Sequence, residues 1–533
     1  MKLNLILPTL AIGFLGSTTG LTTRSPNGLQ LAPRQSSPYP PNTFDQIIDH
    51  YPGSDRYKPH ANGTFKQRYF FDSSYYKSGG PVFLYIGGET SGESRFSNLQ
   101  NGIIQILMQE FNGLGVILEN RYYGSSFPFN TSTTDNLAYL TAEQSIADNA
   151  YFAQHATFPG VSGNLTAPGT PWILYGGSLA GAQTAYSLVA HGDVLYAGIG
   201  SSATVVGRHE YPEWSVIKTW PKIAPTELAI RYDPIQKFGP QDCISSINGI
   251  VAKIDSLVDS HNTEAIQELK GLFGLENLKD IRDFAMTIAF PIGGPMNYPT
   301  STWQELNWNP AYSADDFWNF CSNVTNIDAP ANITAVDTVL AKHTNGQPWT
   351  GLGNYANYFK EVVLPGCVSG DVDSPLNGCF GTQNPCTEQG AYQVAPKSGP
   401  ALILNVLQVD YTQQWCNWAF PRGRYNSIPP SPDLDRLNTY GGYKLSADRL
   451  ALVDGGIDPW LDICVHSKYA PARESTDLRP AYLIAGAGHH WDSYGILNVS
   501  AEPLFIQQTH LFEIKTVRKW LRAFKPSYAH SEL

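Results

Sequence analysis

The sequence predicts an α/β protein with a mainly parallel sheet that helices cover on both faces. Two observations support this prediction. Short, continuous apolar runs end in glycine-rich or polar turns, and segments with helical spacing of apolar residues separate them. Parallel strands are buried on both faces, so they read as uninterrupted apolar runs rather than as alternating ones. The predicted strands are 81–86, 116–118, 172–175, 401–404, 450–453 and 481–484.

The first residues have the pattern of a secretory signal peptide. Lys2 precedes the apolar run 3–15, and the small residues 16–20 follow it. A charged start, an apolar centre and a small-residue end are typical of a cleaved leader, and this run is too short for a membrane span. We therefore expect a signal peptide at 1–20, a linker or propeptide at 21–42, and no membrane anchor.

Secretion in turn predicts N-linked glycans and disulfides. Acceptor motifs for glycosylation stand at Asn62, Asn130, Asn164, Asn323, Asn332 and Asn498. The seven cysteines are Cys243, Cys321, Cys367, Cys379, Cys386, Cys416 and Cys464. Because seven is an odd number, at least one thiol stays free or pairs outside the chain. The cysteine spacing does not match a metal site, so we expect neither a metal nor a cofactor.

Size and charge narrow the class of protein. A chain of 533 residues exceeds the usual size of one domain, so an insertion or a second domain is expected. The net charge is −11, and no run of basic residues interrupts the acidic character. This argues against nucleic acid or an anionic membrane as the partner. The composition fits a large secreted hydrolase.

The turn at 176–181 carries the most chemical information. It follows the predicted strand 172–175 and precedes a helix-like run, with Ser178 at its apex and mostly small residues around it. Small neighbours are what a tight strand-to-helix turn requires, because the helix packs closely on the strand. The N–H of Leu179 then lies at a helix N-terminus, where it can stabilise an oxyanion. The turn is therefore interpreted as a nucleophile elbow, with Ala180 where the usual pattern has glycine.

An acid and a base follow the serine in the order that serine hydrolases of the α/β type use. Asp458 lies in the loop after strand 450–453, and His489 lies in the loop after strand 481–484. A serine hydroxyl needs a histidine to remove its proton, and a buried carboxylate to orient that histidine. Asp454 and His490 are the alternatives for these two roles.

A second oxyanion donor is expected in the turn after the first predicted strand. In this class of fold that donor comes from a loop after an early strand. The turn 87–89 follows strand 81–86, so a backbone N–H of Gly88 or Glu89 is the candidate. The alternative is an ordinary glycine turn. Further along, Thr141 and Gln144 predict a capping box at the start of a helix that runs to Ala156.

The strand pattern stops from 202 to 397, where apolar residues recur at helical spacing. Ser178 and Asp458 are 280 residues apart, which is too long for the one or two sheet crossings that normally separate these positions. We therefore expect a mainly helical cap domain at 202–397. It is inserted between a first part of the main domain at 43–201 and a second part at 398–533.

Five ordered motifs resemble the family of proline-specific serine carboxypeptidases, which also contains dipeptidyl peptidases and prolyl endopeptidases. They are 119–126, 139–144, 176–178, 455–460 and 488–490. The resemblance runs from about Phe44 to the C-terminal helix. It implies an α/β-hydrolase fold with an inserted, mainly helical cap domain, and it implies Ser178, Asp458 and His489 as nucleophile, acid and base. It also implies cleavage on the carboxyl side of proline.

The sequence departs from this family at three positions. Leu179 replaces a usual aromatic residue, Ala180 replaces glycine, and Trp418 stands where many relatives carry glutamate. The first two changes are expected to reshape the substrate pocket. The third implies weaker recognition of a substrate terminus. Trp415, Trp418 and Trp460 are candidates for an aromatic slot that holds proline, because its compact ring is already fixed in φ.

These observations predict a secreted serine peptidase whose partners are peptide or protein substrates, with lysosome or vacuole as the alternative location. One alternative function is a secreted esterase or lipase that uses the same triad. Another is a non-catalytic binding protein with a hydrolase fold, which would normally have lost a triad member.

Overall fold

The computed structural model describes residues 38–214, 234–293, 302–366 and 387–525. The predicted signal peptide, most of the predicted linker, and the cysteines at 367, 379 and 386 lie outside these residues. Within the described part, no helix is both long and apolar enough to cross a membrane.

The molecule is built on a mixed sheet of eight strands in the order β1-β2-β4-β3-β5-β6-β9-β10. The six strands from β4 to β10 pair in parallel, and β2 pairs antiparallel with both β1 and β4. The strands are β1 (Asn42–Ile47), β2 (Thr64–Asp72), β3 (Val82–Ile86), β4 (Leu114–Leu118), β5 (Trp172–Gly177), β6 (Ala197–Ser201), β9 (Leu450–Gly455) and β10 (Ala481–Ile484). Strands β3, β4, β6 and β9 are buried along their whole length, which explains why apolar residues and glycine make up most of their sequences.

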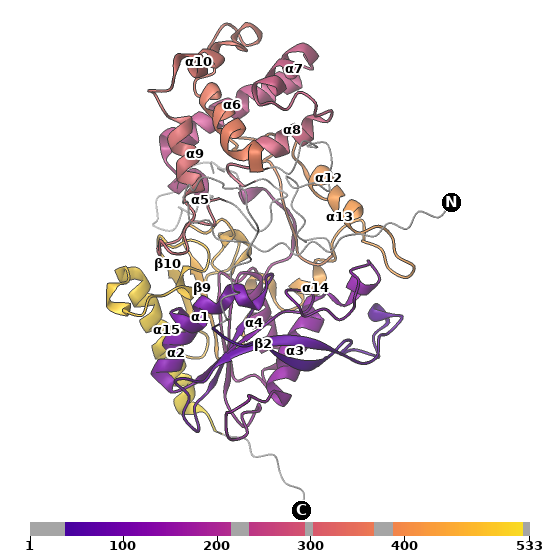
Figure 1. Cartoon of the computed structure of the whole chain (residues 1–533), viewed down its shortest axis with the longest axis vertical. Helices are drawn as coiled ribbons and strands as arrows, with labels where there is room; N and C mark the ends of the chain where they lie inside the picture. The colour runs from indigo at the N-terminus through magenta and orange to yellow at the C-terminus, as the bar shows by residue number, and fades with distance from the viewer. Residues whose placement is uncertain (1–37, 215–233, 294–301, 367–386, 526–533) are drawn as a thin grey trace, which may run out of the picture. The chain divides into compact units, whose positions relative to one another are not determined.

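Helices cover the sheet in two groups (Figure 1). Helix α3 packs against α4, and α15 packs against α2. The short helix α1 leads into α2. The bounds are α1 (Phe96–Gln100), α2 (Ile103–Phe111), α3 (Ala142–His155), α4 (Leu179–His191) and α15 (Leu504–Ala523). Apolar side chains of β3, β4 and β5 pack with those of α3 and α4 in one buried cluster. The predicted α/β class is thus confirmed.

Five of the six predicted strands are present, and the sixth prediction was wrong. Residues 401–404 are buried, yet they belong to no strand longer than a single bridge. Their side chains join the apolar cluster that also contains helices of the insertion. A short apolar run indicates that a segment is buried but does not distinguish a strand from an irregular backbone, so the strand prediction fails here.

The capping box at the start of α3 is half formed. The Thr141 side chain accepts a hydrogen bond from Gln144 N at 3.2 Å, as predicted. The Gln144 side chain does not return to Thr141. Its Nε2 donates to Asp49 Oδ1 at 2.8 Å, and its Oε1 accepts from His50 N at 2.9 Å. The glutamine therefore joins α3 to the segment after β1 instead of capping its own helix.

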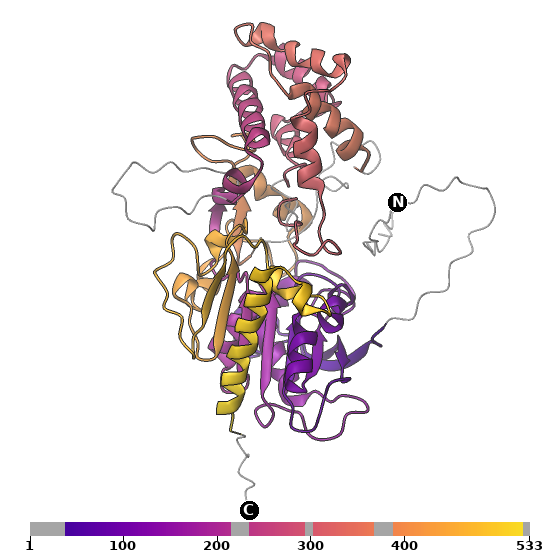
Figure 2. The same cartoon turned by 90° about the vertical axis from the view of Figure 1, so that its left-hand side faces the viewer.

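The predicted helical insertion is confirmed, and Figures 1 and 2 show its helices gathered beyond one end of the strands. They are α5 (Pro234–Phe238), α6 (Gln241–Asp259), α7 (Thr263–Leu272), α8 (Ile281–Ile288), α9 (Asp316–Val324), α10 (Ala331–Thr334) and α11 (Leu352–Tyr358). The insertion also contains a two-stranded parallel sheet of β7 (Arg208–Tyr211) and β8 (Gly390–Gln393), which the sequence did not predict. Three short helices follow: α12 (Val409–Thr412), α13 (Gln414–Ala419) and α14 (Asp435–Asn438).

Cysteine chemistry agrees with the expectation of disulfides and a free thiol. Cys243 on α6 and Cys321 on α9 form a disulfide that links residues 78 positions apart. Cys416 is disulfide-bonded as well. Cys464 is free and buried. The six asparagines of the predicted glycosylation motifs are all exposed, as glycan attachment requires, and attachment itself stays a prediction.

Replacing both Cys243 and Cys321 by serine should destabilise the insertion. The disulfide closes a long loop, and removing such a bond typically costs about 2–5 kcal/mol of the free energy of unfolding. Calorimetry of the double variant should therefore show a lower melting temperature for the transition that includes α6 and α9. An unchanged thermogram would contradict this expectation. Substitution is preferable to a reducing agent here because Cys416 is also disulfide-bonded.

Candidate active site

Ser178 lies at a strained turn between β5 and α4. Its φ is 60° and its ψ is −127°, a combination that side-chain-bearing residues rarely adopt. The turn is tight because a Cβ on Gly176 would stand 2.1 Å from Ala180 O, and one on Gly181 would stand 2.7 Å from Ser201 O. The N–H of Ser178 donates to Ser201 O at 3.0 Å. This geometry is that of a nucleophile elbow.

The loops after β9 and β10 bring Asp458 and His489 into contact. His489 Nδ1 lies 2.8 Å from Asp458 Oδ2, and both side chains are buried. Asp458 Oδ1 accepts a second hydrogen bond from Trp460 N at 2.8 Å. With Nδ1 donating to the carboxylate, His489 Nε2 is an acceptor, and it makes no hydrogen bond to any described residue. The ring of His489 is thus oriented by Asp458, and its Nε2 is available to accept a proton.

The two alternative residues have other partners. Asp454 accepts a hydrogen bond from His466 Nδ1 at 2.6 Å. His490 Nδ1 lies 3.0 Å from Ser493 Oγ, and burial together with the neighbouring His489 holds the pKa of His490 well below its usual range. The geometry therefore favours Asp458 over Asp454 and His489 over His490. The His490 ring still lies against the elbow, since a Cβ on Gly177 would stand 3.0 Å from its Cγ.

The turn after β3 lies beside the elbow, as expected for an oxyanion loop. A Cβ on Gly88 would stand 3.5 Å from the Ala180 Cβ. The N–H of Gly87 donates to Leu118 O at 2.8 Å, so it is not available to a ligand. Within the described structure, the N–H groups of Gly88 and Glu89 have no acceptor. These two N–H groups remain the candidates for oxyanion donors, together with the N–H of Leu179.

Indole groups connect the insertion to the loops that carry Asp458 and His489, a feature that the sequence did not reveal. On the acid side, Trp303 Nε1 donates to Ile457 O at 2.8 Å, and Trp460 Nε1 donates to Gln304 Oε1 at 2.5 Å. On the base side, two hydrogen bonds link Trp491 to the insertion. Its Nε1 donates to Leu306 O at 2.7 Å, and its carbonyl accepts from Trp308 Nε1 at 2.9 Å. The segment around 303–308 therefore lies over the carboxyl ends of β9 and β10.

The tryptophans proposed for a proline slot differ in their surroundings. Trp460 is buried and stacks on Tyr211, with ring centroids 5.5 Å apart. Trp418 lies on α13 and is 43% exposed. The side chain of Trp415 lies outside the described part of the structure. The slot is therefore still a prediction.

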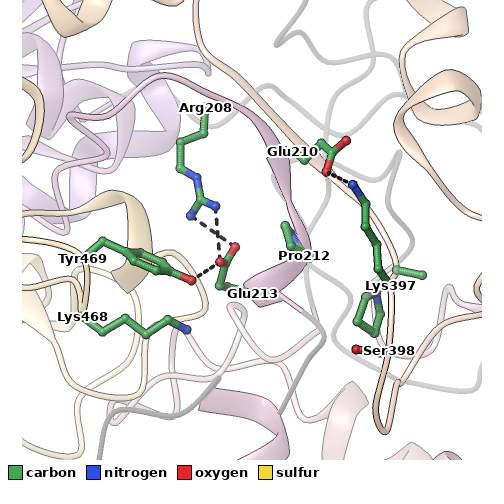
Figure 3. A pocket seen from close by; sticks show the side chains of 10 residues that line it. Arg208, Glu210, Pro212, Glu213, Lys397, Ser398, Lys468 and Tyr469 are labelled. Carbon is green, nitrogen blue, oxygen red and sulfur yellow. Dashed lines mark hydrogen bonds and ion pairs between the residues drawn. The ribbon is translucent and has the colours of Figure 1, made fainter. Parts of the chain in front are cut away.

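A cavity of about 500 Å³ lies beside β7 (Figure 3). Four of its charged side chains face one another in two pairs, and the fifth, Lys468, pairs with Asp462. Arg208 Nη1 is 3.2 Å from Glu213 Oε2, and Lys397 Nζ is 3.3 Å from Glu210 Oε2. Because these charges compensate each other, the cavity presents little net charge to a ligand.

A buried network of polar side chains connects the loop of His489 to the strands next to the elbow. Asp492, three residues after His489, accepts hydrogen bonds from Tyr175 on β5 and from Ser201 at the end of β6, both at 2.6 Å. Glu513 of α15 is in contact with Asp492. Burial raises the pKa of Asp492 and raises the pKa of Glu513 well above its usual range. The network joins the histidine loop, the elbow strands and α15.

The sheet order, the strained serine and the paired Asp458 and His489 define a serine hydrolase of the α/β-hydrolase fold. Residues 53–508 match the family described as serine carboxypeptidase S28, so the chain belongs to that family and is a serine-type peptidase. The resemblance inferred from the sequence motifs is thereby confirmed.

Individual relatives agree with the family. The chain is 35% identical to a "Probable extracellular serine carboxypeptidase" of Arthroderma benhamiae, over 91% of this chain and 68% of the relative. It is 27% identical to "Serine protease vicPa" of Bipolaris victoriae, over 85% and 83%. It is 25% identical to the human "Lysosomal Pro-X carboxypeptidase", over 91% and 88%. Among solved structures, it is similar to potato epoxide hydrolase I, with 11% identity, a TM-score of 0.31 and coverage of 91% and 100%.

Glu513→Gln should flatten the pH dependence of stability. The raised pKa means that folded Glu513 keeps a proton which the unfolded chain releases above about pH 4.5. The free energy of unfolding therefore falls with rising pH, by up to about 1.4 kcal/mol per pH unit for one group, until the pH reaches the folded pKa. Glutamine is uncharged in both states, so melting temperatures between about pH 5 and pH 7 should decline less in the variant.

The exposed Glu276 supplies the matched control. Glu276→Gln should leave the wild-type pH profile intact. If Glu513→Gln also keeps that profile, the buried carboxyl is not the group responsible.

Proposed function

We propose that the protein is a secreted serine carboxypeptidase that hydrolyses peptide bonds on the carboxyl side of proline. Ser178 is the nucleophile, His489 the general base and acid, and Asp458 the orienting carboxylate. The observation that carries this proposal is the 2.8 Å hydrogen bond between His489 Nδ1 and Asp458 Oδ2. It leaves Nε2 of His489 as an acceptor in a loop that lies against the elbow of Ser178.

The reaction is an acyl transfer in two stages. Ser178 Oγ attacks the carbonyl carbon of the scissile bond while His489 Nε2 takes the hydroxyl proton. The same imidazolium then protonates the leaving amine, and a water molecule hydrolyses the acyl-enzyme by the reverse proton path. Asp458, held by Trp460 N, stabilises the imidazolium. The N–H of Leu179 and one from Gly88 or Glu89 hold the oxyanion. No step requires a cofactor.

The preference for proline rests on kinship and on one physical argument. Relatives at 24–25% identity carry the name Pro-X carboxypeptidase. An aromatic wall binds the rigid pyrrolidine ring at a small entropic cost, and Trp415, Trp418 and Trp460 are the proposed wall. Membership of a peptidase family favours this reading over an esterase, a lipase or a non-catalytic binding protein.

Residues 202–397 are proposed to act as a cap that restricts access to the triad. The contacts of Trp303 and Trp308 with the two catalytic loops support this role. A cap of this kind shapes the pocket and narrows the substrate range. Secretion is proposed from the leader-like sequence at 1–20, and relatives described as extracellular and lysosomal are consistent with it.

Ser178→Ala should lower turnover of a proline-containing peptide by about three orders of magnitude or more, because only the oxyanion groups and substrate binding remain. Chromatographic assay of the released product checks this. Ser256→Ala, an exposed serine on α6, is the matched control and should keep wild-type turnover. Equal activity of the two variants would remove Ser178 from the mechanism.

The two neighbouring histidines give a further comparison. His489→Ala should lose nearly as much turnover as Ser178→Ala, because the base is gone. His490→Ala should lose less, since it perturbs only packing beside the elbow. The reverse order would assign the base to His490.

Replacing proline by leucine at the cleaved residue of an otherwise identical peptide should abolish most of the turnover. A slot that fits the pyrrolidine ring must open or distort to admit the longer, more flexible side chain. Competition between the two peptides, followed by mass spectrometry, measures the ratio of kcat/KM directly. Similar rates for both peptides would leave a general peptidase and refute the proline preference.

A further inference from the structure

An arginine lies at the edge of the candidate oxyanion turn. Arg95 Nε donates to Gly87 O at 3.2 Å. A Cβ on Gly88 would stand 3.8 Å from Arg95 Nη2 and 3.5 Å from the Ala180 Cβ. The guanidinium therefore lies next to the turn that approaches the elbow. The described residues contain no ion-pair partner for Arg95, and its side chain is only partly exposed.

Two carboxyl groups lie in the same region. Glu89 directly follows Gly88, and Glu305 belongs to the segment that binds both catalytic loops. The neighbours of Glu305 fix its position, because Gln304 accepts from the indole of Trp460 and the carbonyl of Leu306 accepts from the indole of Trp491. Glu305 is thereby held between the loop of Asp458 and the loop of His489.

Neither carboxyl group has a hydrogen bond or an ion pair with any residue that the structure describes. Each interacts electrostatically with both Arg95 and His489. Arg95, Glu89 and Glu305 therefore form a group of three unpaired ionisable side chains around the candidate base. The paired charges of the cavity beside β7 provide a contrast (Figure 3).

We propose that Arg95, Glu89 and Glu305 form the subsite that binds the free C-terminal carboxylate of the peptide substrate. Arg95 supplies the ion pair, Glu89 in its protonated form donates a hydrogen bond to a carboxylate oxygen, and Glu305 lines the subsite beside them. The proposal rests on the peptidase function proposed above and adds the recognition of the substrate terminus.

The protonation states favour a carboxylate as the ligand. Burial raises the pKa of Glu89 to about 7, although Arg95 and His489 oppose the shift. Burial also raises the pKa of Glu305, with Asp316 of α9 adding to the shift and His489 and Arg95 opposing it. Below pH 7 Glu89 is therefore uncharged beside a permanently charged guanidinium, so the site attracts an anion. Above pH 7 ionised Glu89 repels it.

Other titratable groups near the subsite do not reverse this balance. Tyr123 interacts with Glu89, and Tyr494 interacts with both Glu305 and Arg95. Burial raises the pKa of Tyr494 to about 12 and raises the pKa of Tyr123 above its usual value, so both stay neutral in this pH range. His490, next to Arg95, has its pKa held low and is neutral as well.

This subsite is independent of the position that the family resemblance singled out. Trp418 replaces a glutamate of many relatives, and we expected weak recognition of a substrate terminus from that change alone. Arg95, by contrast, donates a hydrogen bond to the turn beside the elbow and carries the charge that a carboxylate needs.

The test compares two peptides of the same sequence, with proline before the last residue and with either a free C-terminal carboxylate or a C-terminal amide. At about pH 5 the wild type should hydrolyse the free acid with a kcat/KM about 10-fold or more above that of the amide, mainly through a lower KM. In Arg95→Gln this ratio should fall towards one. Arg479→Gln, which changes an exposed arginine just before the start of β10, should keep the wild-type ratio.

A pH series identifies the role of Glu89. In the wild type, the KM of the free acid should rise as the pH passes about 7, while the KM of the amide should not. Glu89→Gln keeps a hydrogen-bond donor that cannot ionise, so the rise should disappear. Calorimetry with inactive Ser178→Ala adds a readout without turnover: the free acid should bind about 10-fold more tightly than the amide.

The outcomes separate the subsite from the function. Equal hydrolysis of acid and amide by the wild type overturns the subsite and leaves the peptidase function intact. Equal loss of both substrates in Arg95→Gln overturns it too, because the arginine would then only support Gly87. A preference for a free N-terminus that Glu305→Gln abolishes would assign the carboxyl groups to an ammonium instead. If the wild type cleaves neither peptide, the proposed function itself fails.

Discussion

The close approach of β5, β6 and α4 around Ser178 is the constraint on which the rest of the site depends. Cβ atoms on Gly176 or Gly181 would clash with neighbouring backbone, and Ser178 between them is held at φ 60°. Ser201 transmits this constraint. Its carbonyl accepts from Ser178 N, and its hydroxyl donates to Asp492 in the loop that carries His489. Ser201 therefore fixes the position of the elbow relative to the loop that carries His489.

The insertion contacts both loops of the candidate site. Four indole hydrogen bonds join Trp303, Trp308, Trp460 and Trp491 to backbone or amide groups across the two parts of the chain. Tryptophan has one donor and a large apolar body, so each bond buries apolar surface while it satisfies a polar group. Any movement of the insertion must therefore break contacts next to Asp458 or His489. In the proposed role of the insertion as a cap, access of substrate is therefore coupled to the geometry of the proposed triad.

The sequence predicted the parts of the fold that local patterns control. Fully buried parallel strands and a turn of small residues leave direct traces in sequence, and β3, β5, β9 and the elbow were found in this way. The strand predicted at 401–404 is absent because a buried segment with an irregular backbone has the same apolar sequence pattern as a buried strand. The contacts of the Gln144 side chain with Asp49 and of Trp303 with Ile457 could not have been predicted, because these partners lie far away in sequence and no local pattern records a tertiary hydrogen bond.

Two carboxyl groups of the site differ because of the donors around them. Asp458 accepts hydrogen bonds from His489 and from Trp460 N, so both of its buried carboxyl oxygens have an N–H donor. Glu89 lies nearby without such donors, and burial raises its pKa to about 7. The same exclusion of water thus suits one carboxyl for orienting an imidazole and the other for holding a proton. Because the two carboxyl groups differ in this way, the proposed site can carry out acid–base chemistry and bind an anion at the same pH.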